Sequence, residues 1–161
     1  MKAAIVMGSK SDYPVVERAE AIFAEFGVSY ETRIISAHRT PRVAEDFASK
    51  AEENGIEIII AAAGKAAHLG GVIAAYTAMP VIGLPVKSST MDGLDSLLSM
   101  VQMPKGIPVA TVAIDGAENA ALLAVQILSL KYPELRTKMK SYKIKMEEDI
   151  IKQDREFNQS R

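Results

Sequence analysis

The chain of 161 residues contains no cysteine. This absence excludes disulfides, thiolate metal ligands and cysteine nucleophiles, and it leaves the compartment open. An excess of charge of either sign is also missing, because 19 basic and 20 acidic residues give a net charge of −1. Nucleic acid and acidic membrane surfaces are therefore disfavoured as partners. No apolar run approaches the roughly 20 residues of a membrane-spanning helix.

The remaining composition is that of an ordinary globular protein, with 48% hydrophobic and 24% charged residues. The length suits one domain with a substantial core. The apolar stretch before Gly8 is too short for a signal peptide and predicts a first strand instead. We therefore expect a cytoplasmic protein.

Apolar segments alternate with helical patterns over residues 3–130. The run at 56–63 is almost pure Ile and Ala, which predicts a strand buried on both faces. Gly27 and Gly55 are expected to end helices. The expected strands are residues 3–7, 30–35, 56–63, 80–85 and 108–114, and the expected helices are 15–26, 43–54, 72–78, 94–101 and 117–130.

Such alternation predicts parallel βαβ units with right-handed crossovers. The expected fold is α/β: a three-layer αβα, flavodoxin-like arrangement with five parallel strands in the order 2-1-3-4-5. In this order the loops after strands one and three flank the topological switch point, where ligands tend to bind. The polar loops after the first three strands should converge at that edge.

The composition changes at Pro133, where a highly charged helical segment begins. We expect a flavodoxin-like domain over residues 1–132, with 133–161 as a helix and tail that belong to it. Residues 153–161 are expected to be frayed. A narrow apolar stripe along the segment should dock on the same domain or on another subunit of the oligomer. Its members are Leu135, Met139, Tyr142, Met146 and Ile150.

The loop at 36–41 carries a hydroxyl, an imidazole and a guanidinium in Ser36, His38 and Arg39. Pro41 suits the first position of a helix, and Thr40 suits the N-cap before it. At the carboxyl end of a strand, these groups can hold an anion and move a proton. The alternative is a helix-capping turn with a solvated arginine.

Residues 8–12, Gly-Ser-Lys-Ser-Asp, resemble a phosphate-cradling turn at a helix start. They match neither a Walker A motif nor a dinucleotide fingerprint. A phosphate would repel the carboxylate of Asp12, which suits ribose hydroxyls better. The alternative is a plain capping turn with Ser11 or Asp12 as the cap.

Residues 64–71 combine three glycines with His68, a composition that lets backbone approach a small planar ligand. The alternative is a tight turn in which a carbonyl satisfies His68. His38 and His68 are the only histidines, and both fall at the same expected edge. A metal site is disfavoured, because no carboxylate accompanies them and no i, i+4 pair exists.

Five motifs in register resemble the family of 5-(carboxyamino)imidazole ribonucleotide mutases, in its bacterial mutase branch. This family is also described as the catalytic subunit of phosphoribosylaminoimidazole carboxylase. The resemblance covers about residues 3–130. Its motifs are residues 8–12, 36–41, 66–69, 95–104 and 119–124.

The resemblance implies a flavodoxin-like fold, a homo-octamer with sites at subunit contacts, and an isomerase of purine (IMP) biosynthesis. It implies nucleotide binding and a carboxyl transfer without metal or organic cofactor. Carboxylate moves from the exocyclic amine of an imidazole ribonucleotide to ring carbon C4. It also implies a functional link to the ATP-dependent carboxyaminoimidazole ribonucleotide synthetase.

When the roles of the family's residues are carried over by position, the resemblance implies that His38 is the general acid/base. The substrate-binding positions are Ser9, Asp12, Ser36, Arg39, Ala67, His68 and Leu69. Further pocket positions are Gly8, Ser11, Ala37, Gly64, Lys65 and Ala66.

The third loop departs from the family pattern, with Ala62 and Lys65 in place of glycines and Gly70 in place of proline. Lys65 either obstructs the pocket, adds a carboxylate contact or points to solvent. His68 favours the mutase branch, because the branch that uses CO2 directly has Ser-Asn-Ala where this chain has Ala-Ala-His. Direct carboxylation of aminoimidazole ribonucleotide and a non-catalytic nucleotide-binding module are the alternative functions.

Overall fold

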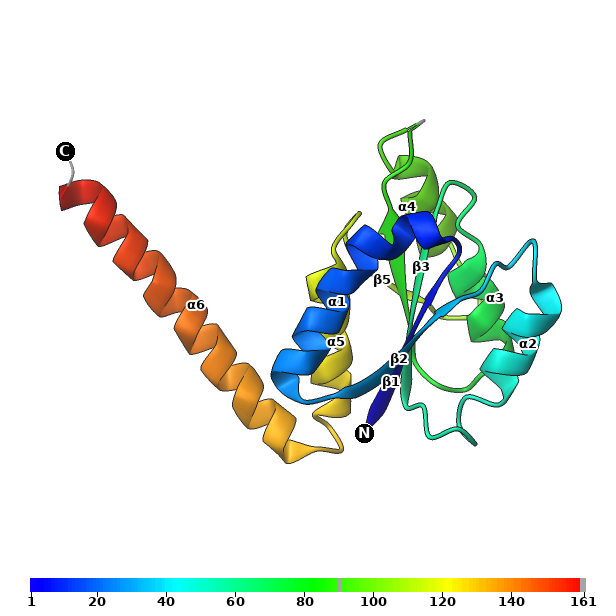
Figure 1. Cartoon of the computed structure of the whole chain (residues 1–161), viewed down its shortest axis with the longest axis horizontal. Coiled ribbons are helices and arrows are strands. Elements are labelled where there is room, and N and C mark those ends of the chain that lie inside the picture. Colours follow the sequence, from blue (N-terminus) through cyan, green and yellow to red (C-terminus); the bar gives the residue numbers. More distant parts are fainter. Residues whose placement is uncertain (90, 160–161) are drawn as a thin grey trace.

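The computed structural model describes residues 1–89 and 91–159. Its five strands form one sheet in the order β2-β1-β3-β4-β5, and every neighbouring pair is parallel (Figure 1). The flavodoxin-like order expected from the sequence is therefore confirmed. The strands are β1 (Lys2–Met7), β2 (Ser29–Ile34), β3 (Ile58–Gly64), β4 (Val81–Val86) and β5 (Ala110–Thr111).

Helices cover both faces of the sheet, which gives the expected three layers. One face packs against α1 and α5, and the other against α2, α3 and α4 (Figure 1). The helices are α1 (Tyr13–Phe26), α2 (Pro41–Ser49), α3 (Leu69–Tyr76), α4 (Leu94–Val101), α5 (Ala117–Leu128) and α6 (Pro133–Gln159), with a short 3₁₀ turn, η1 (Lys10–Asp12).

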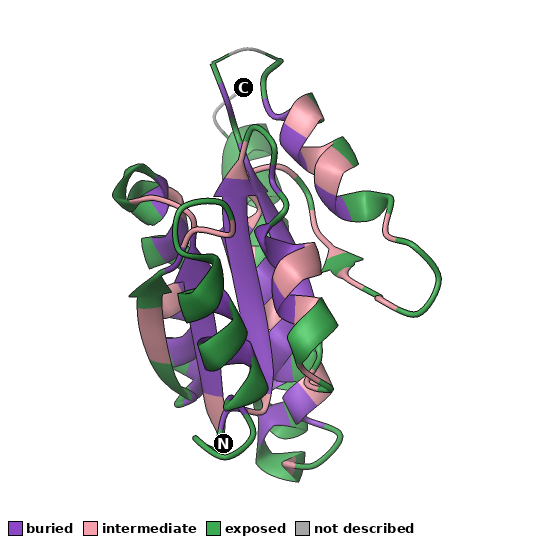
Figure 2. Cartoon of the chain, turned by 90° about the vertical axis from the view of Figure 1, so that its right-hand side faces the viewer, coloured by how far each residue is buried: buried purple, intermediate pink, exposed green. Residues whose placement is uncertain are grey.

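The core lies on both sides of the central strands, which are buried except for Lys2 and Gly64 at their ends (Figure 2). Along β3, Ile58 and Ile60 belong to the cluster under α1 and α5, whereas Ile59 and Ala61 belong to the cluster under α2 and α3. Successive side chains of a strand point to opposite faces, so a strand covered on both faces must be apolar throughout. Each large side chain buried here contributes about 1.5–3 kcal/mol.

Helix α2 and strand β5 end furthest from their predicted bounds. Helix α2 ends at Ser49 rather than at 54, because residues 50–55 form turns in which the Gly55 amide donates to Glu52 O at 2.9 Å. Gly55, with φ +72°, therefore ends a turn and not the helix. Strand β5 spans two residues instead of 108–114, and Pro108 has no amide to donate to the sheet.

Helix α3 starts at Leu69, three residues earlier than predicted. The sequence suggested a loop because Gly70 and Gly71 are poor helix formers. In the structure a Cβ on Gly71 would lie only 2.9 Å from Met103 Sδ. This glycine therefore lets the helix pack closely against the segment that follows α4.

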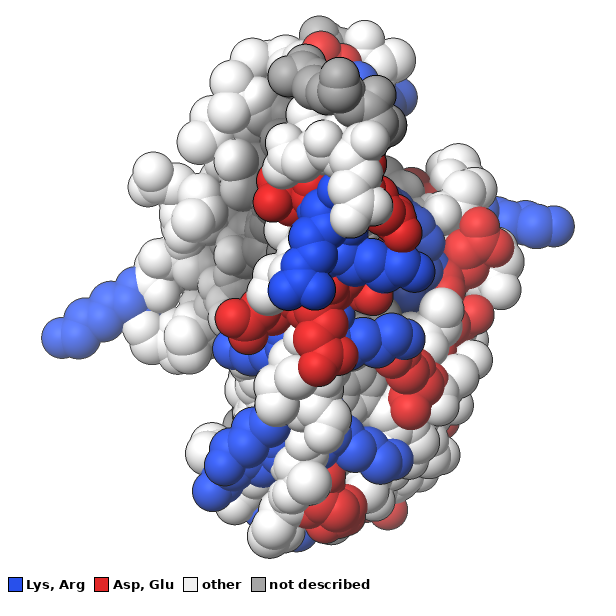
Figure 3. Space-filling model, turned by 90° about the vertical axis from the view of Figure 1, so that its left-hand side faces the viewer, with Lys and Arg blue, Asp and Glu red and all other residues white. Residues whose placement is uncertain are grey.

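The expectation of a frayed C-terminus is wrong for the described residues, because α6 continues to Gln159. Pairs at i, i+4 support its last turns, such as Lys152 with Glu156 at 3.8 Å. The helix projects away from the sheet (Figure 1), on a side where basic and acidic side chains are interspersed (Figure 3). None of the helices within residues 1–89 and 91–159 has the length and hydrophobicity that crossing a membrane requires.

Only the first half of the predicted stripe on α6 packs on its own chain. Leu135 and Met139 are buried, and Tyr142 packs on Phe26 with ring centroids 5.6 Å apart. Met146 and Ile150 are more than half exposed. The remainder of the stripe is thus open on the single chain.

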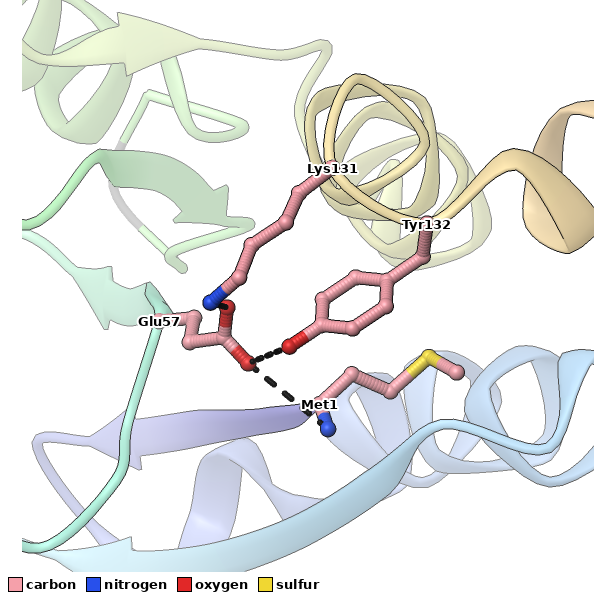
Figure 4. Close-up of polar contacts among 4 residues, drawn as sticks. All are labelled: Met1, Glu57, Lys131 and Tyr132. Atoms are coloured by element: carbon pink, nitrogen blue, oxygen red, sulfur yellow. Dashed lines mark hydrogen bonds and ion pairs between the residues drawn. The ribbon is translucent and has the colours of Figure 1, made fainter.

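Glu57 ties the chain start to the junction of α5 and α6, at the end of the sheet opposite the carboxyl edge (Figure 4). Its carboxylate accepts hydrogen bonds from Lys131 Nζ at 2.7 Å and Tyr132 Oη at 2.8 Å, and it lies 3.6 Å from the amino group of Met1. Burial raises the pKa of Glu57, but these hydrogen bonds and positive charges outweigh it and lower the pKa overall. This cluster holds the two residues that precede α6 against the start of the sheet.

Candidate functional site

The loops that follow β1, β2, β3 and β4 enclose a cleft of about 580 Å³ at the carboxyl edge of the sheet. Strand β1 lies between β2 and β3, so the cleft sits at the switch point of the strand order. The lining residues are Gly8, Ser9, Ser11, Asp12, Ser36, Ala37, His38, Arg39, Ala63, Gly64, Lys65, Ala66, His68, Leu69, Lys87, Ser88 and Ser89.

The first loop is held by a capping box. The Ser9 hydroxyl accepts from the Ser11 amide at 3.3 Å, and the Asp12 carboxylate accepts from the Ser9 amide at 3.1 Å. The side chain of Ser9 therefore caps the turn η1, whereas the capping alternative names Ser11 or Asp12. Asp12 is the N-cap residue of α1, but its side chain makes no capping hydrogen bond to that helix.

Asp12 is a buried carboxyl group at the cleft wall, with 9% of its surface exposed. Burial raises its pKa, while hydrogen bonds from Ser9 and Ser11 and the charge of Arg39 oppose the rise without cancelling it. A carboxylate held in this way is a strong hydrogen-bond acceptor for hydroxyl groups.

Arg39 bridges the first two loops. Its Nη2 atom donates to Gly8 O at 2.8 Å, and its Nε atom donates to Ser36 Oγ at 3.3 Å. Thr40 is the N-cap residue of α2 as expected, but its hydroxyl binds Ser36 instead of capping the helix, with 2.9 Å to the amide and 3.0 Å to the carbonyl. The loop is thus fixed by its own short-range hydrogen bonds.

The second and third loops meet through the two histidines. His38 Nε2 lies 2.8 Å from His68 Nδ1, and the rings are edge-to-face with centroids 5.0 Å apart. His68 therefore pairs with an imidazole and not with the carbonyl of the alternative interpretation. Both side chains line the cleft.

The third loop begins at Gly64, where an added Cβ would lie 3.3 Å from Val86 O. Lys65 follows with a left-handed backbone (φ +57°) and an exposed side chain that lines the cleft. Leu69 is buried at the cleft wall. Ala67 does not line the cleft, because its side chain is fully buried in the core cluster under α2 and α3.

The fourth loop was missed as part of the site. Lys87, Ser88 and Ser89 line the cleft, and the Ser88 hydroxyl donates to the carboxylate of Asp95 at 2.9 Å. A signal was present, because this polar loop follows the strand expected beside β3 and must reach the same edge. Ala63 was also missed, since it reads as an ordinary strand residue.

The charge of the cleft favours an anionic ligand. Arg39, Lys65 and Lys87 line it together with a single acidic residue, Asp12. Within residues 1–89 and 91–159, no group of three or more His, Asp or Glu side chains is placed to hold a metal ion. Hydroxyls, cations and one buried carboxylate suit a small phosphorylated ligand.

Fold and cleft together define a flavodoxin-like α/β protein with a cleft at its switch point, where proteins of this architecture commonly bind small molecules. The AIR carboxylase family matches residues 2–149, and the chain belongs to that family.

The names of similar proteins agree with this family assignment. The chain is 64% identical over 138 residues to the N5-carboxyaminoimidazole ribonucleotide mutase of Pyrococcus horikoshii, covering 86% of this chain and 78% of that protein. It is 54% identical over 158 residues to the mutase of Thermotoga maritima, covering 98% and 92%. The crystal structure of Treponema denticola PurE is similar with a TM-score of 0.88 and 31% identity, covering 96% of this chain and 97% of that one.

Proposed function

We propose that this chain is an isomerase that converts N5-carboxyaminoimidazole ribonucleotide to 4-carboxy-5-aminoimidazole ribonucleotide in purine biosynthesis. The observation that carries the proposal is the His38–His68 pair, which puts a proton-transfer group in a cationic cleft. The names of the relatives support the same reaction.

Different residues of the cleft bind different groups of the substrate. The Arg39 guanidinium and the Ser36 hydroxyl, which lie 3.3 Å apart, bind the 5′-phosphate. The Asp12 carboxylate accepts hydrogen bonds from ribose hydroxyls. Backbone of the third loop encloses the carboxylate that is transferred, because Gly64 and Ala66 present little side-chain bulk.

His38 moves the protons of the reaction. The bond between the exocyclic nitrogen and the carboxylate carbon breaks, its electron pair stays on nitrogen, and nitrogen takes a proton from His38. Carbon C4 then attacks the released CO2, and the proton on C4 passes to His38. Imidazole gives and takes protons near neutral pH, and a closed site keeps CO2 from escaping.

Substrate choice tests this function against its alternatives. Turnover is followed by ultraviolet absorbance with the carboxyamino ribonucleotide alone, or with aminoimidazole ribonucleotide and a low concentration of CO2. The proposal expects efficient conversion of the first substrate only. Preference for CO2 would identify a direct carboxylase, and binding without turnover would identify a non-catalytic nucleotide-binding module.

We also propose a cytoplasmic homo-octamer whose substrate comes from the ATP-dependent carboxyaminoimidazole ribonucleotide synthetase. Support for assembly comes from apolar side chains that the single chain leaves exposed, such as Leu94 and Leu98 on α4 and Met146 and Ile150 on α6. Burying such surface is a common driving force for association.

Light scattering tests the assembly. Truncation after Lys143 keeps Met139 and Tyr142 on the core and removes the open part of the stripe. We expect a smaller particle, and the same result for Met146→Glu combined with Ile150→Glu. Glu148→Gln, on the same exposed stretch, should leave the mass unchanged. An intact octamer in both altered chains would refute a role of α6 in assembly.

A further inference from the structure

Lys65 adopts a backbone conformation that is unfavourable for a lysine. Its φ of +57° lies in the left-handed region, where Cβ crowds the following carbonyl oxygen. Glycine avoids this conflict, and the family pattern has glycine at the matching position. Residues held in this region tend to cluster at functional sites, where the strain is retained for a purpose.

Within the described part of the chain, the Lys65 ammonium is also the cation of the cleft that no protein group binds. Arg39 donates to Gly8 O and to Ser36, and Lys87 pairs with Asp92 at 3.1 Å. Among the residues that the structure describes, Lys65 has no hydrogen-bond or ion-pair partner, and its side chain is exposed in the cleft. A ligand anion can therefore bind it without displacing a protein contact.

The position of Lys65 identifies the anion. Lys65 belongs to the same short loop as His68, which contacts His38 at 2.8 Å. The substrate of the proposed function carries two anionic groups, the phosphate and the migrating carboxylate. Arg39 and Ser36, which flank His38 in the second loop, are assigned above to the phosphate, and the third loop, which carries Lys65, is assigned to the migrating carboxylate.

We propose that Lys65 is a specificity-determining residue whose Nζ atom donates a hydrogen bond to the substrate carboxylate. This inference rests on the proposed function. The contact selects carboxylated imidazole ribonucleotides over the decarboxylated one, which shares the phosphate and ribose. The third loop thereby gains a charged contact that glycine cannot provide.

Calorimetric binding tests the contact with two ligands, 4-carboxy-5-aminoimidazole ribonucleotide and 5-aminoimidazole ribonucleotide. Lys65→Met removes the charge and keeps a long side chain in the strained conformation. We expect it to lose about tenfold or more in affinity for the carboxylated ligand and less than about twofold for the other. Lys65→Arg should retain the discrimination.

Two further variants distinguish the contact of the Lys65 charge from the effect of backbone strain and from the overall positive charge near the cleft. Lys65→Gly should show the same selective loss and a higher melting temperature, because glycine tolerates the left-handed backbone. Lys10→Met removes an exposed charge near the cleft that does not line it, and the variant should bind both ligands as the parent does.

Equal losses for both ligands, or no loss in Lys65→Met, would overturn the contact with the carboxylate. If the parent protein binds both ligands and converts the carboxyamino ribonucleotide, the proposed function stands and only the role of Lys65 falls. If the parent binds neither ligand, both the proposed function and this inference fail.

Discussion

His38 Nε2 and His68 Nδ1 lie 2.8 Å apart although thirty residues separate them in the chain. The contact joins the loop after β2 to the loop after β3 across the end of β1. Because an N–H···N hydrogen bond needs one donor and one acceptor, the two rings cannot both be cationic and keep it. His68 thus holds the orientation of His38, as the group that orients a catalytic base commonly does.

Replacing His68 tests this positioning role. His68→Asn should lower kcat by up to about 10²-fold, since misplacing a reacting group by an ångström can cost that much. The KM should change only a few-fold, because His38 and the phosphate contacts remain. Steady-state kinetics together with a thermal melt would check this. An unchanged kcat in a folded variant would mean that the pair has no part in the reaction.

Arg39 should matter for binding more than for chemistry. Arg39→Ala removes the donor assigned to the phosphate and the bridge between Gly8 and Ser36, and it should weaken binding by roughly 2–4 kcal/mol. Arg42 is exposed on α2 and does not line the cleft, so Arg42→Ala is a matched control with nearly normal KM. Equal KM values in the two variants would contradict the assignment.

Asp12 is expected to lower the stability of the folded protein and to support its activity. Its pKa is raised in the folded protein, so the ionised form costs stability at neutral pH, and this cost disappears as the pH falls through the raised pKa. Asp12→Asn keeps an acceptor for the Ser9 amide without the charge. The free energy of unfolding at pH 7 should rise by less than about 2 kcal/mol, whereas kcat/KM should fall about tenfold or more.

Denaturant titration and kinetics on the same variant measure both effects. A variant that is less stable and fully active would show that Asp12 serves the fold and not the site.

Glu57 should contribute to stability with the opposite pH dependence. Its pKa is lowered in the folded protein, so its contribution is present above the ordinary value of about 4.5 and is lost as the pH falls through the folded pKa. Glu57→Gln should cost about 1 kcal/mol at pH 7 and remove this acid-sensitive component. Glu52→Gln, in an exposed turn, is the control. Parallel stability curves for the parent and Glu57→Gln between pH 7 and 3 would refute the prediction.

The fold was predictable because its signals are local. The buried strand at 58–64 has no polar residue, and Gly27, with φ +71°, ends α1 where the sequence places the stop. The errors arose where long-range packing decides. The early start of α3 depends on the fit of Gly71 against Met103. The end of α6 is a different case, because its i, i+4 pairs, such as Lys152 with Glu156, are local and could have been found in the sequence.

The candidate site was predictable in outline, because parallel strands bring their following loops to one edge. The contact between His38 and His68 could not be derived from the sequence, since it depends on the twist of the sheet and on side-chain rotamers. Ala67 is a residue that the sequence placed in the site and the structure does not. Its place in the motif suggested the pocket, but its side chain turns into the core. The loop at 87–89 was overlooked because it has no glycine-rich or histidine-bearing motif.

The most direct test of the account is the turnover of His38→Asn with the carboxyamino ribonucleotide, with product affinity measured on the same preparation. The account predicts that kcat falls by about 10²–10⁴-fold, the usual contribution of a general acid/base, while the product binds within a few-fold of the parent. Near-normal turnover in this variant would contradict the central claim, because His38 would then not be the group that moves the proton.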